Sequence, residues 1–319
     1  MWAYRRGADS FEAMTDLPAG LRQELAADLV LPSLTPAQCS HSTDDTRKLL
    51  FVLEGGVQVE SVIIPDPPRL TLCISSQAGC GMACAFCATA RLGLLRNLTA
   101  AEIVGQVLAA KRVLRSEERL TNIVFMGMGE PLANYDAVVQ AIEMLTSEWG
   151  VGLSGRRVTV STVGLVPAMK RLVRDTPVHL AVSLSGTTDQ QREALMPVNR
   201  RYPLAALIRM CRSLPIPQRR RITFEYVMLD GVNDSLDDAA RLIALLHGIR
   251  SKVNLIPFNP FPSSGFRPSP ASRIEAFHAR LLASGVAASV RRSRGQDIAA
   301  ACGQLALLAS TTADDDAGH

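Results

Sequence analysis

Three cysteines close together in the chain have the residue type and spacing to hold a metal or an iron-sulfur cluster. Cys80, Cys84 and Cys87 follow the pattern C-x3-C-x2-C, which puts three thiols on one short loop. A zinc site needs a fourth ligand, but the next histidine, cysteine or carboxylate along the chain is Glu102, and the nearest before the triplet is Cys73. A [4Fe-4S] cluster held by three thiolates leaves one iron open to a small chelating molecule. The spacing therefore favours such a cluster over a zinc ion.

A glycine-rich segment follows a predicted strand over residues 122–126 and can bind a ligand. Within residues 127–131, Gly-Met-Gly-Glu-Pro, glycines such as Gly129 allow a ligand to approach the backbone, and Glu130 can accept a hydrogen bond from an ammonium group. Glycine-rich turns usually only turn the chain, so this segment alone is weak support. Residues 99–102, Thr-Ala-Ala-Glu, form a capping box, which predicts the start of a helix and a purely structural role.

Composition and cysteine count indicate a globular protein with reduced thiols. Hydrophobic residues make up 47% of the 319 residues and charged residues 20%, as in soluble domains. Residues 1–10 lack the apolar stretch of a secretory signal, and no apolar run is long enough for a transmembrane helix. We therefore expect a cytoplasmic protein that does not associate with membranes. Seven cysteines are an odd number, which favours metal binding or redox catalysis over a disulfide framework, and we expect Cys39 and Cys211 only to pack in the core.

Strand-like and helical segments alternate along most of the chain and predict the scaffold for these residues. The predicted strands cover residues 71–75, 122–126, 157–162, 179–184, 221–228, 253–257 and 287–291. The predicted helices cover residues 100–115, 135–147, 166–174, 204–212, 236–246 and 272–282. This alternation is typical of an α/β fold with a parallel sheet and right-handed crossovers, and it predicts one barrel-like domain. Ligands of such folds bind beyond the carboxyl ends of the strands, where the residues after each strand gather.

The chain divides into four predicted parts. Residues 1–44 show helical spacing at 11–14 and 21–29, interrupted by prolines. Residues 45–70 contain runs at 49–53 and 57–64 that predict a β-hairpin extension. The barrel covers residues 71–296, and residues 297–319 form a C-terminal segment that carries Cys302 and a tail we expect to be disordered after residue 309.

The cysteine triplet, with Phe86 before its third cysteine, resembles the radical S-adenosylmethionine (SAM) enzymes, and residues 127–131 resemble the motif that holds the amino group of SAM in that superfamily. Four further stretches narrow the resemblance: CISSQ at 73–77, RNLT at 96–99, YVMLDGVND at 226–234 and DIAAACGQL at 297–305. Together they resemble the RNA adenine C2-methyltransferases of the RlmN family, close relatives of the Cfr C8-methyltransferases. The similarity extends from about residue 2 to residue 305 and implies a partial (β/α)6-type radical SAM barrel.

The resemblance implies how the isolated cysteines act. One SAM methylates the cysteine matched by Cys302, and a second SAM yields a 5′-deoxyadenosyl radical that takes a hydrogen from the new methyl group, whose carbon then adds to adenine. Polar transfer fails there because C2 of adenine is electron-poor and has no lone pair. Cys73 then resolves the protein-RNA adduct through a transient disulfide with Cys302, and Glu60 matches the proton acceptor of the family. Arginines at positions 291, 292 and 294 lie close in sequence to Cys302, and we expect their positive charge to favour a thiolate there.

The same resemblance assigns contacts with SAM to residues at the ends of predicted strands. These residues are Gly129, Glu130, Ser161, Ser183, Leu184, Ser185 and Asn259. Ser185 stands where the family usually has a histidine, and a hydroxyl there can still make one hydrogen bond. The N-terminal helical region also matches only the second half of the domain that precedes the barrel in the family.

RNA as the substrate fits the charge distribution. Lysine and arginine exceed aspartate and glutamate by 34 to 30, and arginines cluster at 156–157, 200–201, 219–221 and 291–294. With only 15 aromatic residues, 2 Trp, 4 Tyr and 9 Phe, we expect a single adenine presented to the barrel rather than broad base stacking. The resemblance implies ribosomal RNA (23S), transfer RNA or both as substrates, two SAM molecules per turnover and a small electron donor such as flavodoxin. We expect a monomer.

Three alternatives remain open at this point. The first is C8 methylation of the same ribosomal adenine, as in the Cfr relatives. The second is a radical SAM enzyme that acts on a peptide or a small molecule and has no use for Cys73 and Cys302 as a pair. The third is an RNA-binding protein with a structural zinc site and no catalytic activity, which would be colourless rather than brown.

Overall fold

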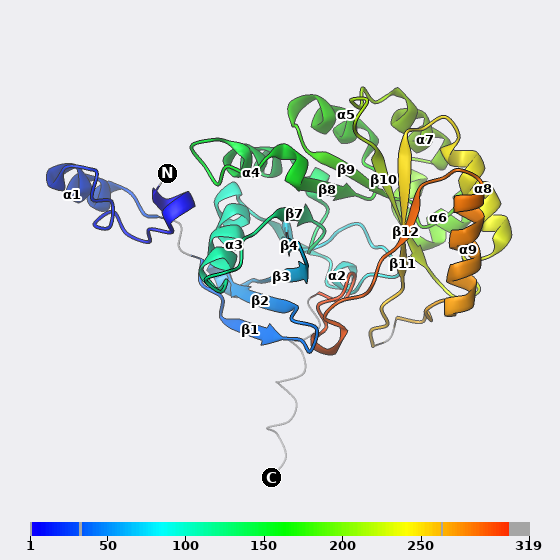
Figure 1. Cartoon of the computed structure of the whole chain (residues 1–319), viewed down its shortest axis with the longest axis horizontal. Coiled ribbons are helices and arrows are strands. Elements are labelled where there is room, and N and C mark those ends of the chain that lie inside the picture. The colour runs from blue at the N-terminus through cyan, green and yellow to red at the C-terminus, as the bar shows by residue number, and fades with distance from the viewer. Residues whose placement is uncertain (1, 32–33, 263, 306–319) are drawn as a thin grey trace, which may run out of the picture.

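The computed structural model describes residues 2–31, 34–262 and 264–305, and its centre is one ten-stranded sheet. The strand order is β1-β2-β3-β4-β7-β8-β9-β10-β11-β12, and every pair from β4 to β12 is parallel. The parallel strands are β4 (Arg69–Cys73), β7 (Asn122–Phe125), β8 (Val158–Thr162), β9 (His179–Ser183), β10 (Ile222–Met228), β11 (Ser251–Pro257) and β12 (Ala288–Val290). The sheet curls, so the predicted α/β fold with a partial barrel is confirmed (Figure 1).

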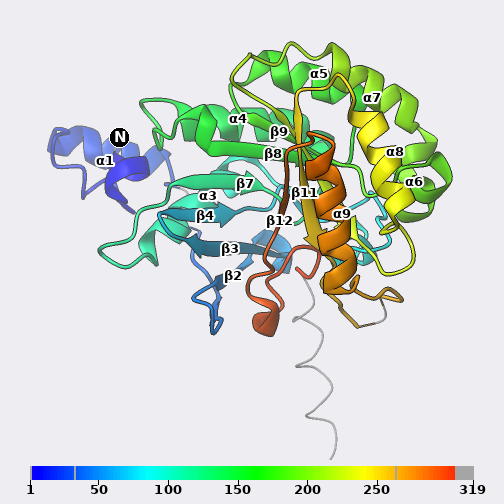
Figure 2. The same ribbon diagram turned by 45° about the vertical axis from the view of Figure 1, so that its right-hand side comes forward.

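Helices cover the outside of this curved sheet (Figures 1 and 2). They are α3 (Ala100–Arg112), α4 (Tyr135–Thr146), α5 (Val166–Asp175), α6 (Asp189–Leu195), α7 (Leu204–Ser213), α8 (Leu236–Leu246) and α9 (Ala271–Ala283). Apolar and polar side chains alternate along β8, which explains why the helices pack on one face of the sheet only. Val158 and Val160 are fully buried in the core, while Thr159 and Ser161 line cavities inside the barrel. The sheet therefore keeps an apolar outer face for the helices and a polar inner face for chemistry.

Three antiparallel strands extend the sheet beyond β4. They are β1 (Gln38–His41), β2 (Arg47–Val52) and β3 (Gln58–Asp66), and β3 pairs with β4 so that Val62 lies opposite Cys73. The predicted hairpin is thus present, and its pairing continues the sheet of the barrel. The boundary between the hairpin extension and the barrel, placed at residue 70 from the sequence, remains a prediction. The first helix, α1 (Ala19–Asp28), buries none of its residues and projects from the body at the left of Figure 1.

Several short elements were not predicted. Two strands, β5 (Gln77–Gly79) and β6 (Leu94–Asn97), form a small separate sheet on either side of α2 (Ala88–Arg91). The seven-residue helix α6 also escaped prediction, although Thr188 caps it by accepting a hydrogen bond from Gln191 N. The predicted helical spacing at 11–14 is wrong, because that segment forms only a turn closed by Met14 N and Phe11 O.

Residues 306–319 lie outside the described residues, and so does the predicted disordered tail. Among the residues that the structure describes, no helix has the length and apolar character needed to cross a membrane.

Candidate active site

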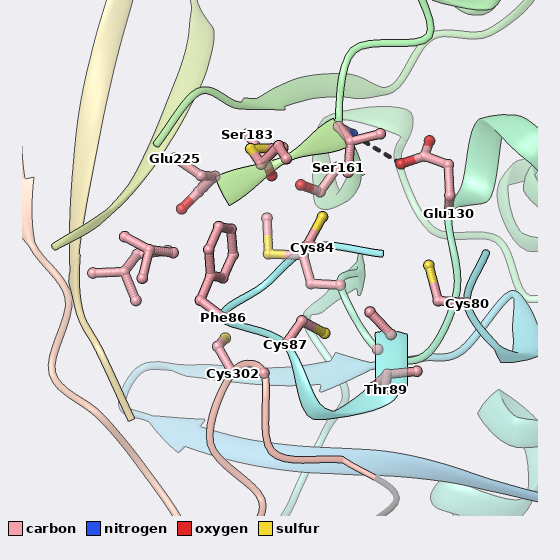
Figure 3. A pocket seen from close by; sticks show the side chains of 18 of the residues that line it. Cys80, Cys84, Phe86, Cys87, Thr89, Glu130, Ser161, Ser183, Glu225 and Cys302 are labelled. Carbon is pink, nitrogen blue, oxygen red and sulfur yellow. Dashed lines mark hydrogen bonds between the residues drawn. The ribbon is translucent and has the colours of Figure 1, made fainter. Parts of the chain in front are cut away.

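The three cysteines of the triplet line one cavity at the carboxyl ends of the parallel strands. Cys80, Cys84 and Cys87 share this cavity with Cys302 from the C-terminal segment, and Figure 3 shows the four side chains around the same space. The loop of the triplet is held from two sides, because Ala85 N donates to the carbonyl of Leu195 in α6 at 2.9 Å and Ala88 N donates to Gly303 O at 2.7 Å. The fold thereby brings Cys302 to the triplet from the far end of the sequence.

The chemistry of the three thiols fits a cluster better than a single ion. Burial raises the pKa of Cys80 to about 11, and it also raises the pKa values of Cys84 and Cys87, so iron must displace protons to bind. Thiolates on one zinc ion lie about 3.8 Å apart, since each Zn–S bond is about 2.3 Å. In the described part of the chain, no three histidine, cysteine or acidic side chains gather as they would around one metal ion. The three thiols nevertheless line one cavity, and three cysteine thiolates are the donor set of a [4Fe-4S] cluster with one open iron.

Glycines let the loop after β7 pack directly against the segment that precedes the triplet. A Cβ on Gly127 would lie 2.7 Å from the carbonyl oxygen of Ile74, and one on Gly129 would lie 2.5 Å from Cβ of Gln77. Gly129 also has a φ of +98°, which L-residues with a side chain rarely adopt. The sequence suggested that a ligand approaches these glycines. In the structure, although both also line the cavity, the group that approaches them closely is the neighbouring chain segment.

Glu130 is buried in the wall of the cavity, with both carboxylate oxygens engaged by backbone groups. Its Oε1 accepts from Leu132 N at 3.0 Å, and its Oε2 accepts from Val163 N at 2.8 Å (Figure 3). The side chain therefore joins the carboxyl ends of β7 and β8. Burial raises the pKa of Glu130 to about 7, against the opposing effect of these hydrogen bonds. A buried carboxyl group that titrates near neutral pH in a cavity is a candidate partner for the ammonium group of a ligand.

We expect Glu130 to destabilise the cluster-free protein as the pH rises. Its folded-state pKa is raised from 4.5 to about 7, so between these values the unfolded chain releases a proton that the folded protein keeps, and stability falls as the pH increases. A rise of this size corresponds to about 3 kcal/mol. Glu130→Gln removes this pH dependence. Because the amide has one acceptor oxygen for two N–H groups, the substitution also costs about 1–3 kcal/mol at every pH.

Urea unfolding of both proteins at a series of pH values from about 4.5 to 8 tests this expectation. The wild-type unfolding free energy minus that of Glu130→Gln should decrease by about 3 kcal/mol across the series. The contributions of all other titrating groups cancel in this difference. A difference that stays constant with pH would show that the carboxyl group does not titrate near neutral pH.

The other predicted SAM contacts divide into two groups. Ser161 and Ser183 line the cavity at the ends of β8 and β9 (Figure 3). Leu184 and Ser185 are not part of the cavity lining: both are fully buried, and the Ser185 hydroxyl accepts a hydrogen bond from Val227 N at 3.2 Å. The structure therefore uses the serine that replaces the usual histidine to join β9 to β10.

Asn259 lines the cavity and also holds the segment that carries Cys302. Its Nδ2 donates to the carbonyl oxygen of Cys302 at 3.2 Å, and its Oδ1 accepts from Gln296 Nε2 at 2.8 Å. Asn259, predicted to contact SAM, therefore also has a structural role, because it holds the backbone of Cys302.

Cys73 and Cys302 both line a second cavity inside the barrel. Burial and the neighbouring Cys302 raise the pKa of Cys73 to about 12, and both thiols are free. Arg291 lines the same cavity as the pair, and the charge of Cys302, with a smaller contribution from Cys73, raises the pKa of Arg291. Arg291 lines both cavities, whereas Arg292 and Arg294 line only the second. The structure thus singles out Arg291 from the three arginines that the sequence placed near Cys302.

The second cavity is strongly basic. Its volume is about 820 Å³, and it is lined by nine arginine and lysine residues but only two acidic ones. The basic residues are Arg69, Arg156, Arg219, Arg220, Arg221, Lys252, Arg291, Arg292 and Arg294. It meets the first cavity at Met126, Glu225 and Cys302, which line both. Cys302 is therefore reachable from the cluster side and from a basic space that suits a phosphate-bearing substrate.

Glu60 is not among the described residues that line these two cavities. It lies on β3, is 3% exposed, and forms an ion pair of 2.9 Å with Lys48. Lys48 Nζ also donates to Ala299 O at 3.5 Å, three residues before Cys302. Glu60 and Lys48 line a third cavity, between the hairpin extension and the segment after the triplet. The proton-acceptor role of Glu60 remains a prediction.

Sequence reasoning missed two buried charged residues: Glu225, at the junction of the first two cavities, and Lys48, in the third. Glu225 lies inside the barrel on β10, and its Oε2 accepts from Asn254 Nδ2 at 2.8 Å. Burial raises the pKa of Glu225, while Arg291 opposes that shift. A carboxylate within the apolar strand sequence Ile-Thr-Phe-Glu-Tyr-Val-Met was the signal that could have identified it. No pattern in the sequence around Lys48 indicated a buried charge, because its partners Glu60 and Ala299 lie on other segments of the chain.

Comparisons with known proteins agree with this geometry. A family model described as "Radical SAM superfamily" matches residues 74–243. The chain is 54% identical to "Dual-specificity RNA methyltransferase RlmN" of Geobacter sulfurreducens over 95% of this chain and 83% of that protein. It is 50% identical to "Dual-specificity RNA methyltransferase RlmN 2" of Myxococcus xanthus over 99% of this chain and 85% of that protein. A crystal structure of a radical SAM methyltransferase from Sphaerobacter thermophilus superimposes with a TM-score of 0.91 at 49% identity, covering 96% of this chain and 90% of that one.

Proposed function

Because the chain belongs to the radical SAM superfamily and, within it, to the RlmN family of RNA methyltransferases, we propose that it methylates C2 of a specific adenine in 23S ribosomal RNA and of an adenine next to the anticodon in transfer RNA. The observation that carries this proposal is the position of Cys302. It lies in one cavity with the cysteine triplet and opens onto the basic cavity that also contains Cys73.

The residues present fit the two cofactors that the reaction needs. Cys80, Cys84 and Cys87 hold a [4Fe-4S] cluster, and Glu130 engages the ammonium group of SAM. When bound, the cluster supplies the electron that cleaves SAM to a 5′-deoxyadenosyl radical. Ser161, Ser183 and Asn259 complete the polar wall for SAM. Two SAM molecules are consumed for each methyl group transferred.

The two isolated cysteines carry the methyl group and release the product. Cys302 accepts a methyl group from one SAM, and the carbon of that group becomes the one bonded to adenine. The Cys73 thiolate then attacks the sulfur of Cys302: the S–S bond forms as the bond between that sulfur and the transferred carbon breaks, and the carbon takes up a proton to become the methyl group of the released RNA. An external thiol reductant returns the disulfide to two thiols before the next turnover. Their shared cavity and the adjacent charge of Arg291 support this pairing. Glu60 is the proton acceptor for the C2 hydrogen, and Lys48 keeps its carboxylate in place.

The basic cavity is the approach route of the RNA. Its arginines contact phosphates, which supply affinity without reading sequence, so that a single unstacked adenine reaches Cys302. A small acidic electron carrier such as flavodoxin reduces the cluster, and the protein acts as a monomer in the cytoplasm.

Mass spectrometry of RNA nucleosides tests this function. Cells that lack the protein should lose 2-methyladenosine from both ribosomal and transfer RNA, and re-expression of the wild-type chain should restore it. Loss of 8-methyladenosine would instead support the C8 alternative. An unchanged nucleoside profile would contradict both reactions.

A further inference from the structure

Arg192 is a fully buried cation that forms no direct ion pair with a carboxylate in the described structure. It lies on α6, its side chain has no solvent exposure, and it is the largest side chain buried to that degree. Its guanidinium donates to the side-chain oxygen of Asn199 at 2.9 Å and to the carbonyl oxygen of Val163 at 2.6 Å. Its Nε has no hydrogen-bond partner. Among the described residues the guanidinium forms no direct ion pair with a carboxylate, and the carboxylate of Asp189 is linked to it through Asn199, whose Nδ2 donates to Asp189 Oδ1 at 2.9 Å.

A cation in this position is costly for the fold. Removing an ion from water costs several kcal/mol even after relaxation, and neutral hydrogen-bond acceptors recover only part of that cost. Burial lowers the pKa of Arg192 to about 10, so the side chain is still charged at neutral pH. A methionine of similar length would fill the same space without this cost. The buried charge therefore calls for a negative partner that arrives after folding.

The element that carries Arg192 packs directly against the loop of the triplet. The carbonyl of Leu195, one turn later on α6, accepts the hydrogen bond from Ala85 N described above. Leu195 and Met196 also form a small apolar cluster with Cys84. Among the groups that oppose the effect of burial on the pKa of Arg192, the Cys84 sulfur contributes most. The strongest of these interactions is thus with a cysteine of the cluster site, and Asp189 contributes less.

We propose that Arg192 is the buried counter-charge of the iron-sulfur site and raises the reduction potential of the cluster held by Cys80, Cys84 and Cys87. This inference rests on the proposed function, which places a cluster there. Reduction adds one electron from an external one-electron donor, and therefore one negative charge, to the cluster. A fixed positive charge in a buried site stabilises the reduced form more than the oxidised form. Arg192 is a positioning residue by this account, since it acts through the cysteine loop.

The position of Arg192 also links the cluster site to the predicted SAM site. The backbone of Val163 donates its N–H to Glu130 Oε2 and accepts from Arg192 through its carbonyl oxygen. One backbone unit therefore lies between the buried carboxylate and the buried cation. A purely structural role for Arg192, holding this peptide in place, is the competing explanation that the experiment must separate from a role for its charge.

Redox titration of the reconstituted full-length protein, followed by electron paramagnetic resonance of the reduced cluster, tests the proposal. Arg192→Gln removes the charge, Arg192→Lys keeps it, and Arg200→Gln is the control, because Arg200 is 73% exposed and pairs with Glu193 in solvent. We expect Arg192→Gln to lower the equilibrium constant for reduction at least tenfold, which is 59 mV for one electron. Arg192→Lys and Arg200→Gln should stay within about threefold of the wild-type value.

Every outcome bears on the proposal. A wild-type potential in Arg192→Gln at full iron content would overturn it, and so would an equal fall in Arg192→Gln and Arg192→Lys, because the charge would then not be the cause. If Arg192→Gln takes up no iron, cluster uptake by Arg192→Lys at the wild-type potential supports the proposal, and failure of both variants overturns it. A wild-type protein that binds no four-iron cluster would contradict the proposed function itself, which distinguishes the two failures.

Discussion

Replacement of Cys302 by alanine should abolish RNA methylation while reductive cleavage of SAM continues. The methyl group passes through the sulfur of Cys302 in the proposed reaction, so no other residue can deliver it. The loss should be at least about 10³-fold, as when the covalent nucleophile of an enzyme is removed. SAM cleavage needs only the cluster and the SAM site, which Cys302→Ala leaves intact. Production of 5′-deoxyadenosine and of methylated adenosine, measured in the same anaerobic assay, separates the two effects.

The structure indicates that this variant keeps its fold. The backbone of the segment is held by Asn259 Nδ2 on the carbonyl of Cys302 and by Ala88 N on the carbonyl of Gly303, and neither bond uses the thiol. Cys39→Ala is the matched control, because Cys39 is a partly exposed cysteine on β1, outside the cavity of the triplet. If Cys302→Ala still methylated RNA at a measurable rate, the methyl group would not pass through this residue. If SAM cleavage also ceased, Cys302 would belong to the SAM site instead.

The sequence predicted the main elements because their signals are local. The helix over 236–246 was predicted at its observed bounds, and in the structure Ser235 and Asp238 form a capping box at its start. The parallel strands were predicted within about two residues of the observed bounds. Apolar β-branched runs that alternate with helices can form few structures other than a parallel sheet. The grouping of the three cysteines on one loop was also predictable, because they lie within eight consecutive residues of the chain.

Features that depend on contacts between distant segments were not accessible from local patterns. Arg192 stands among polar residues in the sequence, as an exposed residue would, yet in the structure its side chain is buried and donates to the carbonyl oxygen of Val163. Lys48 and Glu60 are separated by a turn of the hairpin, and only the pairing of β2 with β3 makes them a buried ion pair. The burial of Leu184 and Ser185 was likewise not apparent from the local pattern. The predicted strand was one residue too long, and the residue after the observed end, Leu184, turns into the core.

Replacement of Cys84 by alanine should prevent assembly of the cluster and with it every SAM-dependent activity. Cys84 is the central member of the triplet and is buried among apolar residues, including Leu195 and Phe258. Two remaining thiolates cannot hold a cluster that already has one iron without a protein ligand. We therefore expect iron content after anaerobic reconstitution to fall from about four atoms per chain to near zero. The brown absorbance and the production of 5′-deoxyadenosine should disappear together.

Cys211→Ala is the control that makes this result specific. Cys211 is also a buried free cysteine, but it lies on α7 in the main core and does not line the cavity of the triplet. Its replacement removes one buried sulfur and should cost about 1 kcal/mol of stability without loss of iron. The two variants delete the same group from equally buried sites, so a difference in iron content isolates ligation from packing. Full iron content in Cys84→Ala would mean that the triplet does not bind the cluster, and the radical chemistry proposed for Cys302 would lose its source.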